Sequence, residues 1–315
     1  MPPVVVYAGR ADQREVYERH LIDAAAAAGL AIDLRMDPAR SDPAGADYLV
    51  FAANGPVRDF TPYTRLKGIL SLWAGVENIL KLDPPADVPL VRMVEEGMTL
   101  GMIDYVMGHV LRHHLDIDRY IDTSPIAEWE TAFPPLASER KVGVLGLGAL
   151  GAACAGRLAA HGFRVIGWSR TQKDIRGVAC RTGDFALDET IAESEILVLL
   201  LPFTPDTHRV LNARRIAQMP LDACLINPAR GQLVDHAALL AALHAGLLRH
   251  ATMDVFDVEP LPPDDPYWFH PRVTVTPHIA SGTRPRTASR SIIEQIARHE
   301  RGEAFTHVVD RARGY

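Results

Sequence analysis

The sequence of 315 residues is long enough for two domains of ordinary size. Hydrophobic residues make up 48% of it and charged residues 23%, which is typical of a globular protein. Its formal charge of -6 argues against a general nucleic-acid partner, which would need a basic surface, and its longest aliphatic run, Ile196 to Leu201, is far shorter than the ~20 residues of a membrane-spanning helix.

The N-terminal part of the chain alternates between strand and helix patterns. The apolar run from Val4 to Gly9 predicts a buried strand, and the alanine-rich stretch from Arg14 to Ala28, which ends at Gly29, predicts a helix. Further buried strands are predicted in the segments DYLVFAA, GILSLWAG and VPLVRM. This alternation predicts a parallel sheet covered by helices.

A longer helical pattern follows, from Gly97 to Tyr120. Apolar side chains recur there near helical spacing, from Met98 to Leu115, which predicts one long helix connecting two domains. The proline-containing stretch TSPIAEWETAFPPLASER has no strong periodicity and is expected to run over the surface.

A second alternating unit begins at Lys141. Strands are predicted in KVGVLG, FRVIGW, EILVLLLP, ACLINPA, HATMDVF and RVTVTPH, and helices in 149–161, 213–219 and 235–245. Two alternating units require two sheets, and the helix expected after Arg284 is too small to stand alone. The predicted fold class is therefore α/β, with two doubly wound parallel-sheet domains.

The first unit of chemistry is a glycine-rich turn between a predicted strand and a predicted helix. Gly146, Gly148 and Gly151 match the pattern G-x-G-x-x-G, which allows a tight turn, close approach of the backbone to a pyrophosphate and close helix–strand packing. This context favours a dinucleotide site over a glycine-rich turn without a ligand. The cofactor-binding candidates here are Gly146, Leu147, Gly148, Ala149, Leu150 and Gly151.

The strand after this turn lacks the acidic residue that usually binds the ribose of NAD, about 20 residues beyond the turn. No Asp or Glu occurs between Lys141 and Lys173, and the strand runs instead into Ser169 and Arg170. Arg170 and Lys173 suit a 2′-phosphate, and Ser169 could donate a hydrogen bond to it. NADPH is thus the preferred cofactor and NAD the alternative; a solvated basic turn without a ligand is the remaining interpretation.

Three polar residues follow successive predicted strands: Arg230 in INPARG, Glu259 in MDVFDVEP and His278 in VTVTPHIASG. Ligands bind at the carboxyl ends of strands in such sheets, so we expect all three near the glycine turn. Reduction of a 2-oxo acid needs a cation for the carboxylate and carbonyl oxygen, and an acid for the new hydroxyl. Arginine and histidine supply these, and a neighbouring glutamate favours the imidazolium form. Taken singly, they could be a surface cation, a loop acid and a cap.

These motifs carry a resemblance that runs over nearly the whole chain. The segments GLGALG, LPFTPDTHRVLN, INPARGQLVD, MDVFDVEPLP and TPHIAS, in this order, resemble the D-isomer-specific 2-hydroxyacid dehydrogenases. Within that family, WAGVENIL, EEGMTLGMIDYVMGHVL and GWSR are most similar to the glyoxylate/hydroxypyruvate reductases of the bacterial A type.

The resemblance implies a discontinuous, flavodoxin-like substrate domain, residues 1–98 and 284–315, and a Rossmann dinucleotide-binding domain, residues 99–283. It also implies a homodimer. In the site it implies Arg230 as the substrate-binding and polarising residue, His278 as the proton donor and Glu259 as its partner. Further substrate-binding candidates are Trp73, Ala74, Gly75 and Val76, and further cofactor-binding candidates are Pro202, Thr204, Pro228, Ala229 and Asp254, the last expected at the nicotinamide carboxamide.

The expected activity is NADPH-dependent reduction of a small 2-oxo acid, glyoxylate to glycolate or hydroxypyruvate to D-glycerate. A reductase for a bulkier 2-oxo acid is the alternative, and a non-catalytic NAD(P)-sensing regulator a less favoured one. We expect no metal, nucleic-acid or membrane partner, and for His109, His113 and His114 a structural role. Cys154, Cys180 and Cys224 are widely spaced, and no secretory signal is evident, which predicts reduced thiols in the cytoplasm.

Overall fold

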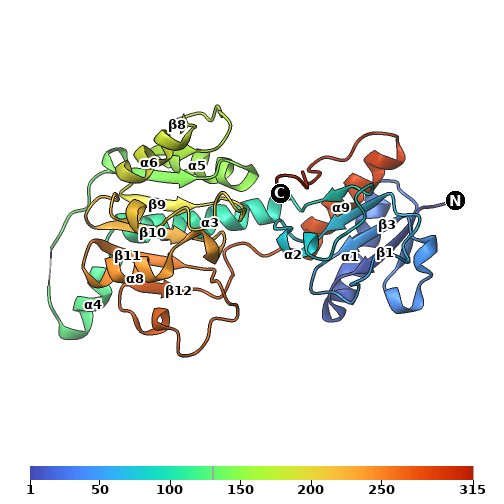
Figure 1. Cartoon of the computed structure of the whole chain (residues 1–315), viewed down its shortest axis with the longest axis horizontal. Coiled ribbons are helices and arrows are strands. Elements are labelled where there is room, and N and C mark those ends of the chain that lie inside the picture. Colours follow the sequence, from blue (N-terminus) through green and yellow to red (C-terminus); the bar gives the residue numbers. More distant parts are fainter. Residues whose placement is uncertain (130, 315) are drawn as a thin grey trace. The chain divides into compact units, whose positions relative to one another are not determined.

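A computed structural model describes residues 1–129 and 131–314 (Figure 1). The chain divides into two compact units, residues 1–98 with 283–315, and residues 99–282. Each is built on one parallel sheet, as the sequence predicts. We call them the smaller and the larger unit.

The smaller unit contains a five-stranded sheet in the order β2-β1-β3-β4-β5. This is the flavodoxin-like order, which confirms the predicted fold class. The strands are β1 (Val4–Ala8), β2 (Asp33–Arg35), β3 (Tyr48–Phe51), β4 (Gly68–Ser71) and β5 (Leu90–Val91). Every residue of β3 and β4 is buried, because helices and loops cover the sheet.

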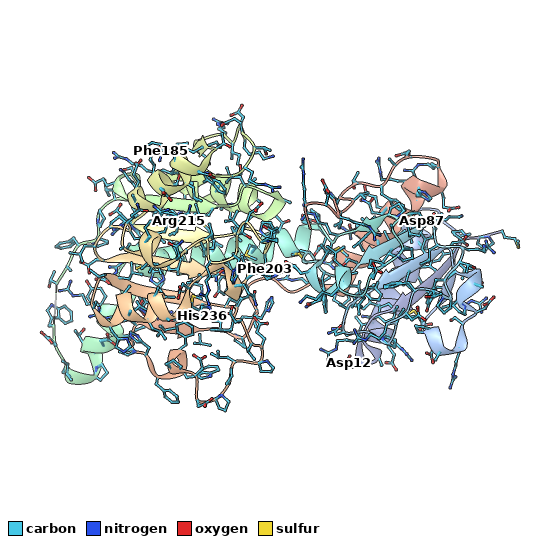
Figure 2. All side chains as sticks on the ribbon, viewed as in Figure 1. Asp12, Asp87, Phe185, Phe203, Arg215 and His236 are labelled. Atoms are coloured by element: carbon cyan, nitrogen blue, oxygen red, sulfur yellow. The ribbon has the colours of Figure 1, made fainter. Side chains whose placement is uncertain are left out.

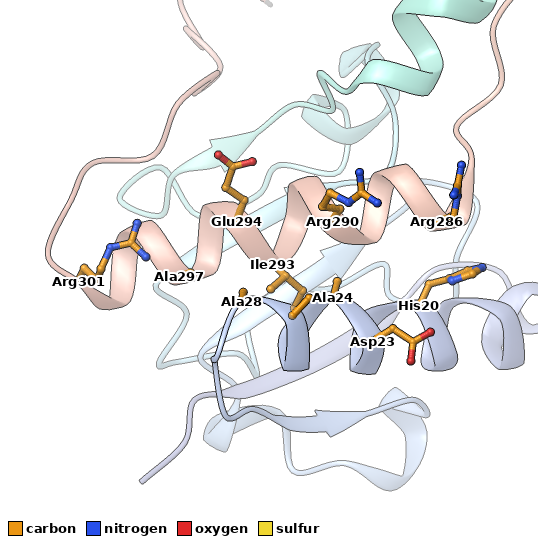
Figure 3. Close-up of a pocket in the computed structure, with 11 residues that line it drawn as sticks. His20, Asp23, Ala24, Ala28, Arg286, Arg290, Ile293, Glu294, Ala297 and Arg301 are labelled. Carbon is orange, nitrogen blue, oxygen red and sulfur yellow. The ribbon is translucent and has the colours of Figure 1, made fainter.

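Two helices from opposite ends of the sequence lie side by side in this unit: α1 (Arg14–Ala27) and α9 (Pro285–Glu300). A short helix, α2 (Glu77–Leu80), follows β4. A groove of about 710 Å³ runs between α1 and α9 (Figure 3). Its walls contain none of the residues predicted for the site: His20, Asp23, Ala24, Ala27, Ala28, Arg286, Arg290, Ile293, Glu294, Ala297 and Arg301.

The larger unit contains a seven-stranded parallel sheet in the order β12-β11-β10-β9-β6-β7-β8. Read from β8, this is the Rossmann order with one added edge strand, again as predicted. The strands are β6 (Lys141–Leu145), β7 (Arg164–Trp168), β8 (Val178–Arg181), β9 (Ile196–Leu199), β10 (Ala223–Asn227), β11 (Leu248–Met253) and β12 (Val273–Val275). The helices after these strands are α5 (Ala149–His161), α6 (Asp184–Glu193), α7 (Ala213–Ile216) and α8 (His236–His244).

The single long helix predicted for 97–120 is wrong in its last part. It is instead two helices, α3 (Glu96–His114) and α4 (Ile117–Thr123), separated by Asp116 in the left-handed conformation at φ 54°. Arg249 of β11 donates one hydrogen bond to the His113 carbonyl at 2.6 Å and another to the Asp116 carboxylate at 2.9 Å. A side chain distant in sequence thus caps the last turn of α3. The periodicity of the local sequence therefore does not predict that the helix ends there.

Large apolar side chains are exposed along α4 and the chain after it, which lie at the margin of the larger unit (green in Figure 1). Trp129 is 96% exposed and Phe133 91%. The others in this stretch are Ile117, Ile121, Ile126 and Leu136. The predicted surface excursion includes Glu130, which lies outside the described residues. No described helix is long and apolar enough to cross a membrane.

Two buried histidines join α3 to the sheet. His113 lies 3.0 Å from the Thr252 hydroxyl and His250 lies 2.8 Å from the Thr274 hydroxyl, measured from Nε2 in each case. Both Nδ1 atoms lie 3.8 Å from the Asp118 carboxylate. Burial lowers the pKa of His250 to about 4, and it lowers the pKa of His113 well below its usual value. Both rings are therefore neutral at pH 7 and hold the fold together.

This neutral pair should make the larger unit sensitive to acid. An unfolded histidine has a pKa near 6.5, so between about pH 6.5 and pH 4 the unfolded chain binds protons that the folded chain does not. On account of His250, the free energy of unfolding should then fall by about 1.4 kcal/mol per pH unit as the pH is lowered through this range. His250→Gln should lose less melting temperature than the native chain between pH 7.5 and 5.0. His20→Gln, on the smaller unit, is the control; an equal loss in His250→Gln would contradict the assignment.

Candidate functional site

The carboxyl ends of the strands of the larger sheet all lie along one edge, because the strands are parallel. The candidate residues of this unit lie in the segments that follow β6, β7, β9, β10, β11 and β12. The sheet therefore brings the glycine turn, the basic turn and the three chemical residues to the same edge, which is where open α/β sheets bind ligands.

The three glycines of the turn are required for three different reasons. Gly146 is at φ 103°, and a side chain on it would meet the Leu200 carbonyl oxygen at 2.5 Å. A side chain on Gly151 would lie 1.7 Å from the Gly146 carbonyl oxygen, so this position must be bare for α5 to start there. At Gly148, the N-cap of α5, nothing lies within 4 Å of an added Cβ. The protein itself thus explains Gly146 and Gly151, whereas the open space at Gly148 is suited to a ligand.

The basic turn lies beside this glycine turn. The Gly146 amide donates to the Trp168 carbonyl at 2.8 Å, which joins the end of β6 to the end of β7. Ser169 is nearly buried, and its hydroxyl donates to the Thr171 carbonyl at 2.8 Å. Arg170 and Lys173 are exposed on the same turn. No carboxylate occupies the end of β7, so the environment suits an anion rather than a bare ribose hydroxyl.

The loop after β9 carries Pro202 and Thr204, with Phe203 between them (Figure 2). The Thr207 hydroxyl ties this loop together, because it donates to the Pro202 carbonyl at 2.7 Å and accepts from the Thr204 amide at 2.8 Å. At the start of the loop, Leu200 donates to the Leu145 carbonyl at 2.7 Å. The loop is thereby fixed to the strand that leads into the glycine turn.

A buried amide that the sequence reasoning missed fixes the loop with Arg230. Asn227 ends β10 and is fully buried; its side chain accepts from the Ala229 amide at 3.2 Å and donates to the Arg230 carbonyl at 2.9 Å. Pro228 and Ala229 form the turn between them. An asparagine at the end of an otherwise apolar strand was the available signal, since a buried amide requires partners.

A glycine beside Arg230 brings two loops together. A side chain on Gly231 would meet the Phe256 carbonyl carbon at 2.2 Å and the Asp257 amide nitrogen at 2.5 Å. Only a bare backbone therefore allows the loop after β10 to pack on the loop after β11. This contact places Arg230 next to the segment that ends in Glu259.

Glu259 and His278 form a direct pair. The Nδ1 atom of His278 lies 2.7 Å from Oε2 of Glu259, and Oε1 of the same carboxylate accepts from the Phe256 amide at 2.9 Å. Because an ionised carboxylate only accepts hydrogen bonds, Nδ1 of His278 carries a proton and donates it to Glu259. The other ring nitrogen, Nε2, is not engaged by Glu259. The His278 side chain is 52% exposed, so a ligand can reach it.

His278 adopts the left-handed conformation at φ 54°, which is unfavourable for residues other than glycine. Asp254, fully buried, holds it there: the His278 amide donates to its carbonyl at 2.8 Å. The Asp254 carboxylate accepts from the Ile279 and Ala280 amides, each at 2.9 Å, and from the Thr276 hydroxyl at 2.6 Å. The contact of Asp254 with a nicotinamide carboxamide stays a prediction.

The remaining candidates, Trp73 to Val76, lie in the smaller unit between β4 and α2. Val76 is buried and is the N-cap of α2, and Trp73, Ala74 and Gly75 are partly exposed. The Ser71 hydroxyl donates to the Trp73 carbonyl at 2.9 Å, which fixes the bend after the strand. In its own sheet this segment also follows the carboxyl end of a strand.

The larger unit fits a phosphorylated dinucleotide. The first amides of α5 have no partner within the helix, the position of Gly148 is open, and the neighbouring turn bears Arg170 and Lys173 with no acid before Asp174. These features would hold the pyrophosphate and a 2′-phosphate.

Residues 105–280 match the family model described as "D-isomer specific 2-hydroxyacid dehydrogenase, NAD binding domain". The chain belongs to this family. Glyoxylate/hydroxypyruvate reductase A of Yersinia enterocolitica is 40% identical over 88% of this chain and 90% of that protein. The same-named protein of Photorhabdus laumondii is 41% identical over the same shares.

Solved structures of the family are similar over their whole length. A D-isomer specific 2-hydroxyacid dehydrogenase of Xanthobacter autotrophicus, in complex with NADPH and MES, has a TM-score of 0.93 at 41% identity, covering 100% of both chains. An NADPH-dependent glyoxylate/hydroxypyruvate reductase of Sinorhizobium meliloti, in complex with NADP and sulfate, has a TM-score of 0.88 at 35% identity, also covering 100% of both. The resemblance read from the sequence is thus confirmed.

The open space at Gly148 gives a test of the dinucleotide site. Gly148→Ala should keep the native melting temperature, because its Cβ meets no protein atom, but should weaken NADPH binding by about tenfold or more by blocking backbone approach. Gly151→Ala should instead lower the melting temperature. Calorimetric titration with NADPH and thermal unfolding measure both. Unchanged NADPH affinity in Gly148→Ala would remove this turn from the binding site.

Proposed function

We propose that the chain is an NADPH-dependent reductase of small 2-oxo acids, converting glyoxylate to glycolate and hydroxypyruvate to D-glycerate. The observation that carries the proposal is the 2.7 Å pair of His278 and Glu259 at the strand edge that also bears the glycine turn. A paired histidine beside a dinucleotide site is the arrangement that carbonyl reduction requires. The names of the Yersinia and Sinorhizobium proteins support the same substrates.

Each chemical residue has one role in this proposal. Bound NADPH supplies the hydride that reduces the carbonyl carbon. Arg230 binds the substrate carboxylate and draws electron density toward the carbonyl oxygen. His278 gives the proton on Nε2 to that oxygen as it becomes a hydroxyl, and Glu259 stabilises the imidazolium before the transfer. The products are the 2-hydroxy acid and NADP, with the proton returned to His278 from solvent.

The other candidates position the reactants. We assign the backbone amides near Gly75 and Val76 to the substrate carboxylate, with Trp73 and Ala74 beside it, and hence the substrate to residues 1–98 and 284–315. The loop of Pro202 and Thr204, together with Pro228 and Ala229, lines the cofactor in residues 99–283. Asp254 contacts the nicotinamide carboxamide. The NADP complexes of the Xanthobacter and Sinorhizobium proteins support NADPH over NAD for this chain.

Turnover tests the activity. The purified chain should oxidise NADPH with glyoxylate and with hydroxypyruvate, followed by absorbance. His278→Ala should lower kcat by at least about a hundredfold and leave NADPH affinity nearly unchanged, because the ring gives a proton and is not part of the cofactor cradle. His244→Ala, an exposed histidine at the end of α8, is the control. If no 2-oxo acid is turned over, the chain is better explained as a non-catalytic sensor. If only bulky 2-oxo acids are turned over, the chain is a reductase for a different substrate class.

Cofactor choice is tested at Arg170. Arg170→Asp should raise KM for NADPH by about tenfold to a hundredfold, the loss of one charge-assisted contact, and should change KM for NADH much less. Arg157→Asp carries the same charge change on the exposed face of α5. Equal changes for both cofactors in Arg170→Asp would mean that the turn is only a basic surface.

We further propose that the chain is a cytoplasmic homodimer. The three cysteines are free, which suits a reducing compartment. Ile126, Trp129 and Phe133 belong to a set of exposed apolar side chains. Exposing a large apolar surface to water is unfavourable, and such surfaces mark protein contacts. A second copy of this chain is the proposed occupant.

Mass measurement tests the dimer. Light scattering after size exclusion should give twice the chain mass of 34.6 kDa. The double variant Trp129→Glu, Phe133→Glu should give the single mass, because two charges would be buried without partners. Phe185→Glu, at another exposed aromatic position, is the control and should remain a dimer. A native chain that is monomeric at micromolar concentration contradicts the proposal.

A further inference from the structure

A chain of hydroxyl groups leads from helix α3 to the segment that carries His278. The Tyr105 hydroxyl lies 2.7 Å from the Thr276 hydroxyl, which in turn donates to the Asp254 carboxylate at 2.6 Å. A threonine has one hydroxyl proton, and Thr276 donates it in the hydrogen bond to Asp254. Tyr105 is therefore the donor in the hydrogen bond between the two hydroxyls. The direction of the whole chain is thus fixed, from tyrosine to threonine to carboxylate.

The Asp254 carboxylate at the end of this chain of hydroxyl groups accepts hydrogen bonds from residues on both sides of His278 in the sequence. Thr276 precedes the histidine by two residues, and the Ile279 and Ala280 amides that donate to Asp254 follow it directly. His278 itself is in the left-handed conformation, which is unfavourable for a residue with a side chain. The bonds to Asp254 offset that cost. They also set the direction from which the ring meets Glu259.

Tyr105 is held in a way that suits a fixed donor. Its ring lies against His109, with 4.4 Å between the ring centroids, so its rotamer is restrained. Burial raises the pKa of its hydroxyl above the usual range, so the hydroxyl carries its proton at neutral pH. Asp254 is fully buried, where hydrogen bonds are stronger than in water.

The position of Tyr105 in the fold gives this contact added meaning. Its helix, α3, begins in residues of the smaller unit and continues into the larger one, and the chain crosses back just beyond the His278 segment, at Gly282 and Thr283. Within the larger unit, the bond between Tyr105 and Thr276 therefore joins the two stretches that lead to the crossings.

We propose that Tyr105 and Thr276 are positioning residues for proton transfer: their hydroxyl chain fixes the Asp254 carboxylate, and through it the conformation in which His278 pairs with Glu259. The inference rests on the proposed function of His278. It adds two residues, one on a helix remote in sequence from the three chemical side chains, that act on kcat without touching substrate.

Two variants of Thr276 separate positioning from bulk packing. Thr276→Val keeps the shape and removes the hydroxyl, whereas Thr276→Ser keeps the hydroxyl. We expect Thr276→Val to lower kcat about tenfold with KM for the 2-oxo acid within about twofold of native, and Thr276→Ser to restore most of kcat. Tyr105→Phe should lower kcat similarly. The double variant Tyr105→Phe, Thr276→Val should be little slower than either single variant, because the chain acts as a unit.

Thr274 provides a matched control two residues earlier. Its hydroxyl also has a buried partner, His250 at 2.8 Å, but it has no bond to Asp254. Thr274→Val should lose a comparable amount of melting temperature and keep kcat.

The outcomes distinguish this inference from the function on which it rests. If His278→Ala still turns over, the proposed mechanism fails and the positioning role with it. If His278→Ala is inactive while Thr276→Val and Tyr105→Phe keep native kcat, only the positioning role is overturned. It is also overturned if Thr276→Ser does not recover activity, or if Thr274→Val loses as much kcat as Thr276→Val.

Discussion

Asp254 makes the hydrogen bonds on which the geometry of the larger unit depends. The backbone amide of Asp254 donates to the carbonyl of Asn227 at the end of β10, and the backbone carbonyl of Asp254 accepts from the amide of His278 beyond β12. One residue thus joins the ends of three neighbouring strands. A buried carboxylate is costly to desolvate unless donors surround it. Here the donors come from the segment that carries His278, so the same hydrogen bonds satisfy the buried acid and order that segment.

Much of this architecture is readable from the sequence because it follows from periodicity and from backbone freedom. The apolar runs that became β6, β9 and β10 bury every residue or nearly so, and such runs are unambiguous when glycine or proline ends them. The glycine pattern of Gly146 to Gly151 predicts both the turn and the start of α5. Once parallel pairing is inferred, the candidates Arg230, Glu259 and His278 must share an edge, and the structure places them there.

The parts that could not be predicted depend on contacts between distant segments. Nothing near Asp116 indicates that α3 stops, because the cap is Arg249 of β11. Asn227 and Thr276 look like ordinary polar residues at strand ends until their partners are known. The role of Gly231 is visible only when the loop after β11 lies against it. In each case the deciding partner is far away in sequence, so local patterns carry no trace of it.

The three glycines of the turn differ in what a side chain at each position would meet. Gly146 and Gly151 are excluded from change by the protein's own backbone, whereas Gly148 faces no protein atom at all. A descendant that kept this fold but abandoned its dinucleotide would be free to vary at Gly148 and would remain fixed at the other two. The middle glycine is therefore the one position of the three at which a side chain would be excluded by a ligand and not by the protein itself.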